Sequence, residues 1–255
     1  WEQSRQGAGR VVFITGKLGV GKTALALDAT STFQSAIRLV GYCDPTKTHT
    51  PYYLVTQIME AYLATLSVDR LQKAVEKLSD LAILLPTVHA WVSKSTHKQN
   101  ALQRSVSLKP RQGQRRVLNQ LMEFIQEATQ EMPWAVILDD LHWADSNSLS
   151  LLCHLSQHLD SLPMLIVGTF EEERLHTRHP LQEIWRGTSC RYTHHLHLEN
   201  LSRQEAQQAL ENLLRSPVPA SLLTKLYQHT CGNPLYLEEI ALGMMDDGLI
   251  TMEEG

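Results

Sequence analysis

The sequence GKLGVGKT, residues 16–23, decides the fold. It fits the pattern GxxxxGK[ST], in which glycines allow successive backbone N–H groups to turn towards one phosphate. The stretch before it, VVFIT at 11–15, is the β-branched and apolar run of a strand that is buried on both faces. The stretch after it, from 22 to about 34, has small and apolar residues at helical spacing. This context predicts a phosphate-binding loop between a strand and a helix.

The expected contacts with a nucleoside triphosphate differ along this loop. Lys22 would reach the β- and γ-phosphates, and the Thr23 hydroxyl would bind magnesium. The residues that we predict to bind the nucleotide here are Gly16, Lys17, Leu18, Gly19, Val20, Gly21, Lys22 and Thr23. The alternative is a chance match in a glycine-rich turn, which the flanking strand and helix argue against.

A second apolar run ends in two acids. Residues 134–138, WAVIL, predict a buried strand that leads directly into Asp139 and Asp140. An acid at the end of a strand beside the loop can hold magnesium, and a second acid can orient or deprotonate the attacking water. We therefore predict Asp139 as a metal ligand beside Thr23, and Asp140 as the residue that acts on water. Lys22, Asp139 and Asp140 form the predicted catalytic set, and the alternative is an aspartate pair that caps the next turn.

Strands and helices alternate over most of the chain. Further strands are predicted at 36–40, 164–169 and 192–198, and helices at 52–80, 116–130 and 146–159. After 201 the pattern is helical only, at 203–214, 221–228 and 235–245. We predict an α/β fold with three α/β/α layers and a parallel sheet over residues 1–198, followed by a small all-helical lid domain over 199–255. The segment 81–116 gives the weakest secondary-structure signal, and it could hold a helix with a long loop.

Composition bounds the class of protein. The chain has 255 residues, of which 43% are hydrophobic and 20% charged, with a net charge of −4. These values are typical of a soluble globular protein, and they predict no membrane contact and no direct nucleic-acid contact. Four scattered cysteines without a CxxC pair predict reduced thiols, a cytoplasmic location and no zinc site. Because the chain begins at Trp1, we interpret it as a fragment of a larger protein.

Three strings together resemble one family. GKLGVGKT at 16–23, LDDLHWAD at 138–145 and GNPL at 232–235 are similar to the signal-transduction ATPases with numerous domains (STAND), which are relatives of the AAA+ ATPases. The resemblance extends from about residue 11 to residue 250. It is closest to the bacterial ATPase domains found in large LuxR-type transcription regulators, in some class III nucleotide cyclases and next to some protein kinase domains. It implies a P-loop NTPase fold with ATP and Mg²⁺ as ligands.

The resemblance also assigns roles to single residues. It identifies Asp139 and Asp140 as the Walker B acids, and it implies that Pro234 of the lid lies against the adenine ring. The alternative for Pro234 is a plain helix start with proline at the first position. Relatives carry a γ-phosphate-sensing arginine directly after the Thr-aromatic pair, but here Glu171 follows that pair. Either Arg174 substitutes for this arginine or phosphate sensing is weakened.

The function that these observations favour is an ATP hydrolase with slow turnover, acting as the regulatory switch of a multidomain signalling or transcription regulator. Its expected partners are ATP and ADP, effector and sensor domains in the same full-length chain, and a second copy of itself in a nucleotide-dependent manner. One alternative is a nucleotide-binding scaffold without significant turnover. Another is a DNA-associated ATPase of the initiator or clamp-loader type. The histidines at 194, 195 and 197 predict an exposed strand face rather than a metal site.

Overall fold

The computed structural model describes residues 1–247 apart from 34, 83, 95–109, 178 and 187–191. The strands are β1 (Arg10–Gly16), β2 (Ile37–Tyr42), β3 (Trp134–Asp139), β4 (Met164–Phe170) and β5 (Thr193–Leu198). The helices are α1 (Glu2–Arg5), α2 (Lys22–Ser31), α3 (Tyr53–Thr65), α4 (Val68–Lys77), α5 (Pro86–Lys94), α7 (Pro110–Glu131), α8 (Ser146–Gln157), α9 (Leu181–Arg186), α10 (Arg203–Leu214), α11 (Ala220–Thr230) and α12 (Pro234–Asp246). Two short 3₁₀ helices border the site described below, η3 (Leu141–Trp143) and η5 (Glu172–Arg174).

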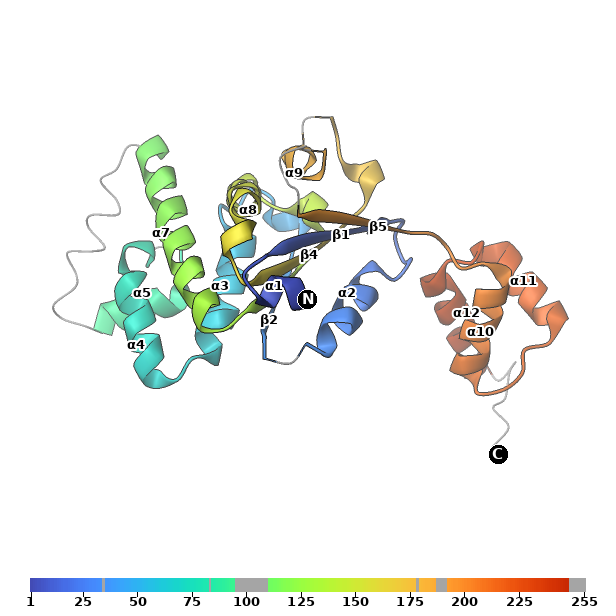
Figure 1. The fold of residues 1–255 in the computed structure, drawn as a ribbon. Coiled ribbons are helices and arrows are strands. Elements are labelled where there is room, and N and C mark those ends of the chain that lie inside the picture. The colour runs from blue at the N-terminus through green and yellow to red at the C-terminus, as the bar shows by residue number, and fades with distance from the viewer. Residues whose placement is uncertain (34, 83, 95–109, 178, 187–191, 248–255) are drawn as a thin grey trace.

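The five strands form one parallel sheet in the order β2-β3-β4-β1-β5 (Figure 1). β1 lies between β4 and β5, with Thr15 opposite Phe170 and Gly16 opposite Leu198. Because the strands are parallel, their carboxyl ends meet at one edge of the sheet. This edge therefore brings together the loop after β1, the two acids at the end of β3 and the acids after β4.

The alternation of side chains along β1 explains the two helical layers. Val11 and Phe13 join the core under α3, α7 and α8, whereas Ile14 joins the smaller core that includes Ala26 of α2. Successive side chains of a strand point to opposite faces, so the sheet is covered on both sides. Every residue of β3 and β4 is buried, whereas β5 at the edge is mostly exposed. The predicted α/β fold with a parallel sheet between helical layers is confirmed.

The three C-terminal helices, α10, α11 and α12, have a hydrophobic core of their own. Its buried residues include Ala206, Leu210, Leu226, Leu237 and Ala241, none of which belongs to the two cores of the sheet. A capping box begins α10, in which the Ser202 hydroxyl accepts from the Glu205 amide and the Glu205 carboxylate accepts from the Ser202 amide. Figure 1 shows these helices beyond the carboxyl end of β5.

One segment predicted to be helical contains a break. The helical segment expected at 52–80 forms two helices, α3 and α4, because Leu66 and Ser67 adopt extended backbone conformations with ψ of 144° and 159°. Ser67 is the N-cap of α4 and Asp69 lies in its first turn, which is the usual chemistry of a new helix start. In the segment 81–116, where the secondary-structure signal of the sequence is weak, the structure has the helix α5. Among the described residues, no helix has the length and apolar character needed to cross a membrane.

Candidate functional site

The loop between β1 and α2 owes its shape to glycine. Gly16, Gly19 and Gly21 have positive φ values of 145°, 76° and 99°, and Gly21 is the N-cap of the ten-residue helix α2. A left-handed residue at this position lets the chain turn sharply into the helix, whose free N–H groups then face the loop. The structure thus places the eight predicted residues 16–23 in one turn at the carboxyl edge of the sheet.

Lys22, the first residue of α2, lies inside this turn. Its side chain is buried, and its Nζ donates hydrogen bonds to the carbonyl oxygens of Gly16 at 3.0 Å and Lys17 at 2.8 Å. A buried ammonium group needs such partners, because an unpaired charge is costly to remove from water. The loop therefore holds this cation at the point where phosphate oxygens would be received.

Asp139 is the centre of a hydrogen-bond network that joins three segments. Its Oδ1 accepts from the Thr23 hydroxyl at 2.8 Å and from the Thr169 hydroxyl at 2.5 Å. The Thr169 hydroxyl in turn accepts from the Asp140 amide at 2.9 Å. The carboxylate and hydroxyl oxygens of Asp139 and Thr23 are the donor type that Mg²⁺ prefers, so these two residues fit the predicted metal site.

Asp140 lies beside this network in an unusual backbone conformation. Its φ of 57° is left-handed, and its side chain is 42% exposed. Partial burial raises the pKa of the Asp140 carboxyl above its usual value, and Asp139 and Glu171 raise it further. Lys22 and Arg174 oppose this shift. A carboxylate with a raised pKa and access to solvent is chemically suited to accept a proton from water.

Arg174 is already engaged with the acid that precedes it. Its Nε lies 3.0 Å from Oε2 of Glu171, and its guanidinium carbon lies 5.4 Å from the centre of the Trp143 ring. The Glu171 side chain is only 13% exposed. The positive charge that the sequence offered as a substitute for the sensing arginine is thus paired with a carboxylate of its own turn.

His142 is a buried residue of η3, directly after the two acids. Its side chain is 1% exposed, and its Nδ1 accepts a long hydrogen bond of 3.4 Å from the Glu171 amide. Its Nε2 has no hydrogen-bond partner among the described residues. Burial lowers the pKa of His142 to about 4, although Glu171 opposes the shift. The ring is therefore neutral at physiological pH.

The C-terminal helices touch the loop through the turn that begins α12. Asn233 Nδ2 donates to the Leu18 carbonyl at 2.8 Å, and the Leu235 amide donates to the Gly19 carbonyl at 3.2 Å. A Cβ on Gly19 would lie 2.8 Å from both Asn233 Oδ1 and Leu235 Cβ, so this close approach requires glycine. We call these contacts between residues 18–19 and 233–235 the loop–helix contact.

Asn233, and not the predicted Pro234, forms the side-chain hydrogen bond from this turn to the loop. Pro234 is the first residue of α12 and lines a hollow against α10, together with Leu210 and Leu213. The residue that reaches the loop is Asn233, whose Oδ1 also caps α12 by accepting from the Leu235 and Tyr236 amides. The GNPL string contained this signal, since asparagine before proline is a frequent helix start. The contact of Pro234 with adenine stays a prediction.

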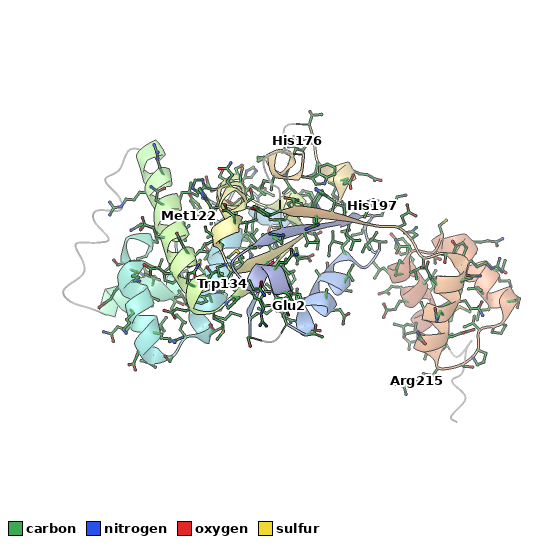
Figure 2. All side chains as sticks on the ribbon, in the orientation of Figure 1. Glu2, Met122, Trp134, His176, His197 and Arg215 are labelled. Carbon is green, nitrogen blue, oxygen red and sulfur yellow. The ribbon has the colours of Figure 1, made fainter. Side chains whose placement is uncertain are left out.

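A hollow of about 450 Å³ lies between the loop and the C-terminal helices. It is lined by Gly16, Lys17, Leu18, Glu171, Glu172, Glu173, His197, Asn200, Thr230, Asn233 and Tyr236. Figure 2 shows His197 near the end of β5 that leads to these helices. Its Nδ1 lies 3.0 Å from the Thr15 hydroxyl, whereas the His195 ring packs near Phe13 and Trp185. Within the described ranges, the exposed histidines of β5 do not form a ligand cluster.

Comparison with known proteins agrees with this geometry. Residues 1–167, which include the loop as well as Asp139 and Asp140, match the family described as AAA ATPase domain. No curated protein matches the chain in sequence.

Among solved structures, the chain is similar to a STAND protein with a tetratricopeptide repeat sensor from Pyrococcus horikoshii, with 20% identity and a TM-score of 0.48, covering 92% of this chain and 28% of that one. It is also similar to a variant of RuvB from Thermotoga maritima, with 12% identity and a TM-score of 0.50, covering 96% of this chain and 58% of that one. A second RuvB variant gives 13% identity, a TM-score of 0.50 and the same coverage. The RuvB likeness shows a shared fold, and this chain spans less than two thirds of each of these proteins.

Proposed function

This chain belongs to the AAA ATPase domain family, and from that premise we propose that it is an ATP-binding regulatory switch that hydrolyses ATP slowly. The observation that supports this most directly is the network on Asp139. It links the loop through Thr23, the Walker B strand through Asp139 itself, and β4 through Thr169. Phosphate binding, metal binding and the end of β4 are therefore coupled through one carboxylate.

In this proposal the loop residues bind the phosphates and Asp140 acts on water. Lys22 exchanges its two carbonyl partners for phosphate oxygens, and the N–H groups at the start of α2 donate to the same phosphates. Thr23 and Asp139 would hold Mg²⁺, which would supply positive charge to the phosphates. Asp140 orients a water molecule and takes its proton on a carboxylate oxygen, to which its raised pKa is suited.

Slow turnover follows from the charges around the predicted γ-phosphate position. Glu171 stands where relatives carry an arginine, and Arg174 is paired with it rather than free. The same pair favours a second candidate, a nucleotide-binding scaffold without significant turnover. The two candidates differ only in hydrolysis, because both require the phosphate-binding loop.

The switch itself would operate through the loop–helix contact. Because Asn233 and the Leu235 amide bond directly to loop carbonyls, a loop that rearranges around phosphate changes what these groups can bind. The C-terminal helices, residues 199–255, would then act as a lid domain with Pro234 against adenine, while residues 1–198 form the nucleotide-binding domain. Further proposed partners are effector and sensor domains in a longer cytoplasmic chain, as in LuxR-type transcription regulators, and a second copy of the chain.

Two measurements test this function. Titration calorimetry should show magnesium-dependent binding of ATP and ADP, and a chain that binds neither would refute both candidates. Phosphate release should then be compared with that of Asp140→Asn, which keeps the shape of the side chain but cannot take a proton. We expect turnover to fall by about 100-fold or more, with ATP affinity nearly unchanged. Equal background rates in both proteins would favour the scaffold.

A further inference from the structure

Three side chains meet next to the predicted magnesium ligands without belonging to them. Asp140 and His142 follow β3, and Glu171 follows β4. One ligand atom from each lies within 4.8 Å of the other two. Asp140 Oδ1 is 3.9 Å from His142 Nδ1, and Glu171 Oε1 is 3.9 Å from His142 Nε2. We propose that these three residues form a binding site for a divalent transition metal ion of the zinc type.

The unpartnered nitrogen of His142 is the observation that distinguishes this site from an ordinary group of acids. The ring is almost completely buried, and Nε2 has no hydrogen-bond partner in the part of the chain that the structure describes. A buried polar atom without a partner costs free energy, which a bound ion on that atom would recover. Metal binding through Nε2 places the proton of the neutral imidazole on Nδ1, so the long hydrogen bond that Nδ1 accepts from the Glu171 amide is given up when the ion binds.

The three side chains are near enough to bind one ion if their ligand atoms draw together. Zinc binds imidazole nitrogen and carboxylate oxygen at about 2.0–2.2 Å, which puts tetrahedral ligand atoms roughly 3.4 Å apart. Because the two separations of 3.9 Å involve different ring nitrogens, the relevant limit is the 4.8 Å within which one ligand atom of each residue lies, and the three atoms need to draw together by up to roughly 1.4 Å. Three protein ligands leave a fourth position of the ion open to water.

Charge and ligand type favour a transition metal over magnesium. Asp140 and Glu171 raise the local negative charge beside Asp139, and Arg174 pairs with Oε2 of Glu171, which leaves Oε1 directed at His142. Mg²⁺ takes oxygen ligands in strict octahedral geometry, whereas imidazole together with carboxylate suits Zn²⁺ and its neighbours. The oxygen pair of Thr23 and Asp139 and the mixed set around His142 thus select different ions.

A consequence for turnover rests on the proposed function. Asp140 cannot take a proton from water while it ligates a metal, so Zn²⁺ at this site would inhibit hydrolysis. Nucleotide binding would persist, because Lys22 and Thr23 are not among the three ligands. Zinc would then convert a slow hydrolase into a nucleotide-binding module without turnover.

The binding itself is tested without nucleotide, by titrating Zn²⁺ into the apo chain in a calorimeter. A His158→Ala background removes a surface pair, because the His154 and His158 rings lie 5.0 Å apart on one side of α8 and could bind zinc themselves. We expect one site, weakened about tenfold or more by His142→Gln and by Glu171→Gln. The matched control is Glu172→Gln, which removes a neighbouring acid outside the cluster and should leave the affinity within about twofold.

The outcomes separate the site from the proposed function. Absence of saturable binding, unchanged affinity in Glu171→Gln, or an equal loss in Glu172→Gln would each overturn the site. If His142→Gln fails to fold, Glu171→Gln decides alone, since that side chain is partly exposed. Phosphate release at buffered free Zn²⁺ then tests inhibition, and unchanged release on a zinc-loaded chain would overturn that consequence. A chain without any ATPase activity would refute turnover while the zinc titration still stands.

Discussion

Several polar side chains at the carboxyl edge of the sheet are buried and hydrogen-bonded. Among the described residues, the C-terminal helices bond to the same loop through one asparagine side chain and one backbone amide. The edge residues Lys22, Asp139 and Thr169 are all buried, and each has at least one side-chain hydrogen bond. The C-terminal helices have their own core, and Asn233 and Leu235 are their hydrogen-bond link to Leu18 and Gly19.

This difference separates two tasks. Groups that bind phosphate need fixed positions, and the fully buried strands β3 and β4 provide them. A part that responds to a ligand needs two arrangements of similar free energy, and a small contact can be made or broken at little cost. The predictions that follow test this division, beginning at the sheet edge.

The largest effect is expected for Lys22→Ala. It removes the charge–charge hydrogen bonds to phosphate, worth about 3 kcal/mol together, so ATP affinity should fall by about 100-fold or more. Calorimetry with MgATP measures this, and thermal melting confirms that the variant is folded. Lys225→Ala, on an exposed position of α11, is the control and should bind like the parent chain. Parent-like affinity in Lys22→Ala would contradict the phosphate role of the loop.

Acid should destabilise the sheet edge through His142. Its pKa is about 4 in the folded chain and 6.5 when exposed, so the unfolded state binds the proton more tightly between these values. The free energy of unfolding should therefore fall as the pH drops from 6.5 towards 4, by about 3 kcal/mol at most.

Urea denaturation with a chelator present, at pH 7 and pH 4.5, measures this loss. His142→Gln should remove most of the dependence, because glutamine does not titrate in this range. His158→Gln, at an exposed position, should retain it. A parent-like slope in His142→Gln would show that other groups cause the acid sensitivity.

Gly19→Ala should break the loop–helix contact. The left-handed φ of 76° and the collision of a Cβ with Asn233 and Leu235 together cost about 2 kcal/mol. We expect faster amide exchange at the start of α12 and ATP affinity lower by about tenfold. Gly243→Ala is the matched control, because a Cβ there meets nothing within 4 Å and alanine favours the helix. Unchanged exchange in Gly19→Ala would refute the contact.

The smallest effect is expected for Asn233→Asp. Aspartate keeps the Oδ1 acceptor that caps α12 but cannot donate to the Leu18 carbonyl. The loss of one hydrogen bond, about 1 kcal/mol, should speed exchange at Leu235 and Tyr236 by about fivefold. Asn233→Ala removes both the cap and the donor and should have a larger effect. Equal exchange in Asn233→Asp and the parent would mean that the asparagine serves only as a cap.

Much of the sheet could be predicted because most of its strands are continuous apolar runs. The strands β1, β3 and β4 are buried on both faces, so they appear as unbroken apolar runs next to glycine or acid. The interruption between α3 and α4 was missed because the apolar periodicity continues past Leu66, and only the extended Ser67 shows the break.

Site residues that lie within one short motif could be predicted from the sequence. Contacts between residues that are distant in the sequence could not. Residues 16–23 and Asp139 each lie in a contiguous motif, whereas the Thr169 hydroxyl reaches Asp139 from a strand 30 residues away. Two further relations also depend on tertiary structure: the packing of Arg174 on the Trp143 ring, and the contact of Asn233 with Leu18. A linear pattern contains residue types, but it does not contain these distances.

The position of β1 in the sheet has a consequence for biosynthesis. β1 ends at Gly16, yet both of its neighbours, β4 and β5, lie more than 140 residues later in the chain. During translation the loop therefore leaves the ribosome long before either neighbouring strand exists. β2 likewise cannot pair until its neighbour β3 has been synthesised. Pairing between such distant segments is slow, and exposed apolar strands are prone to aggregate in the interval. The phosphate-binding loop is therefore synthesised well before the two strands that flank β1.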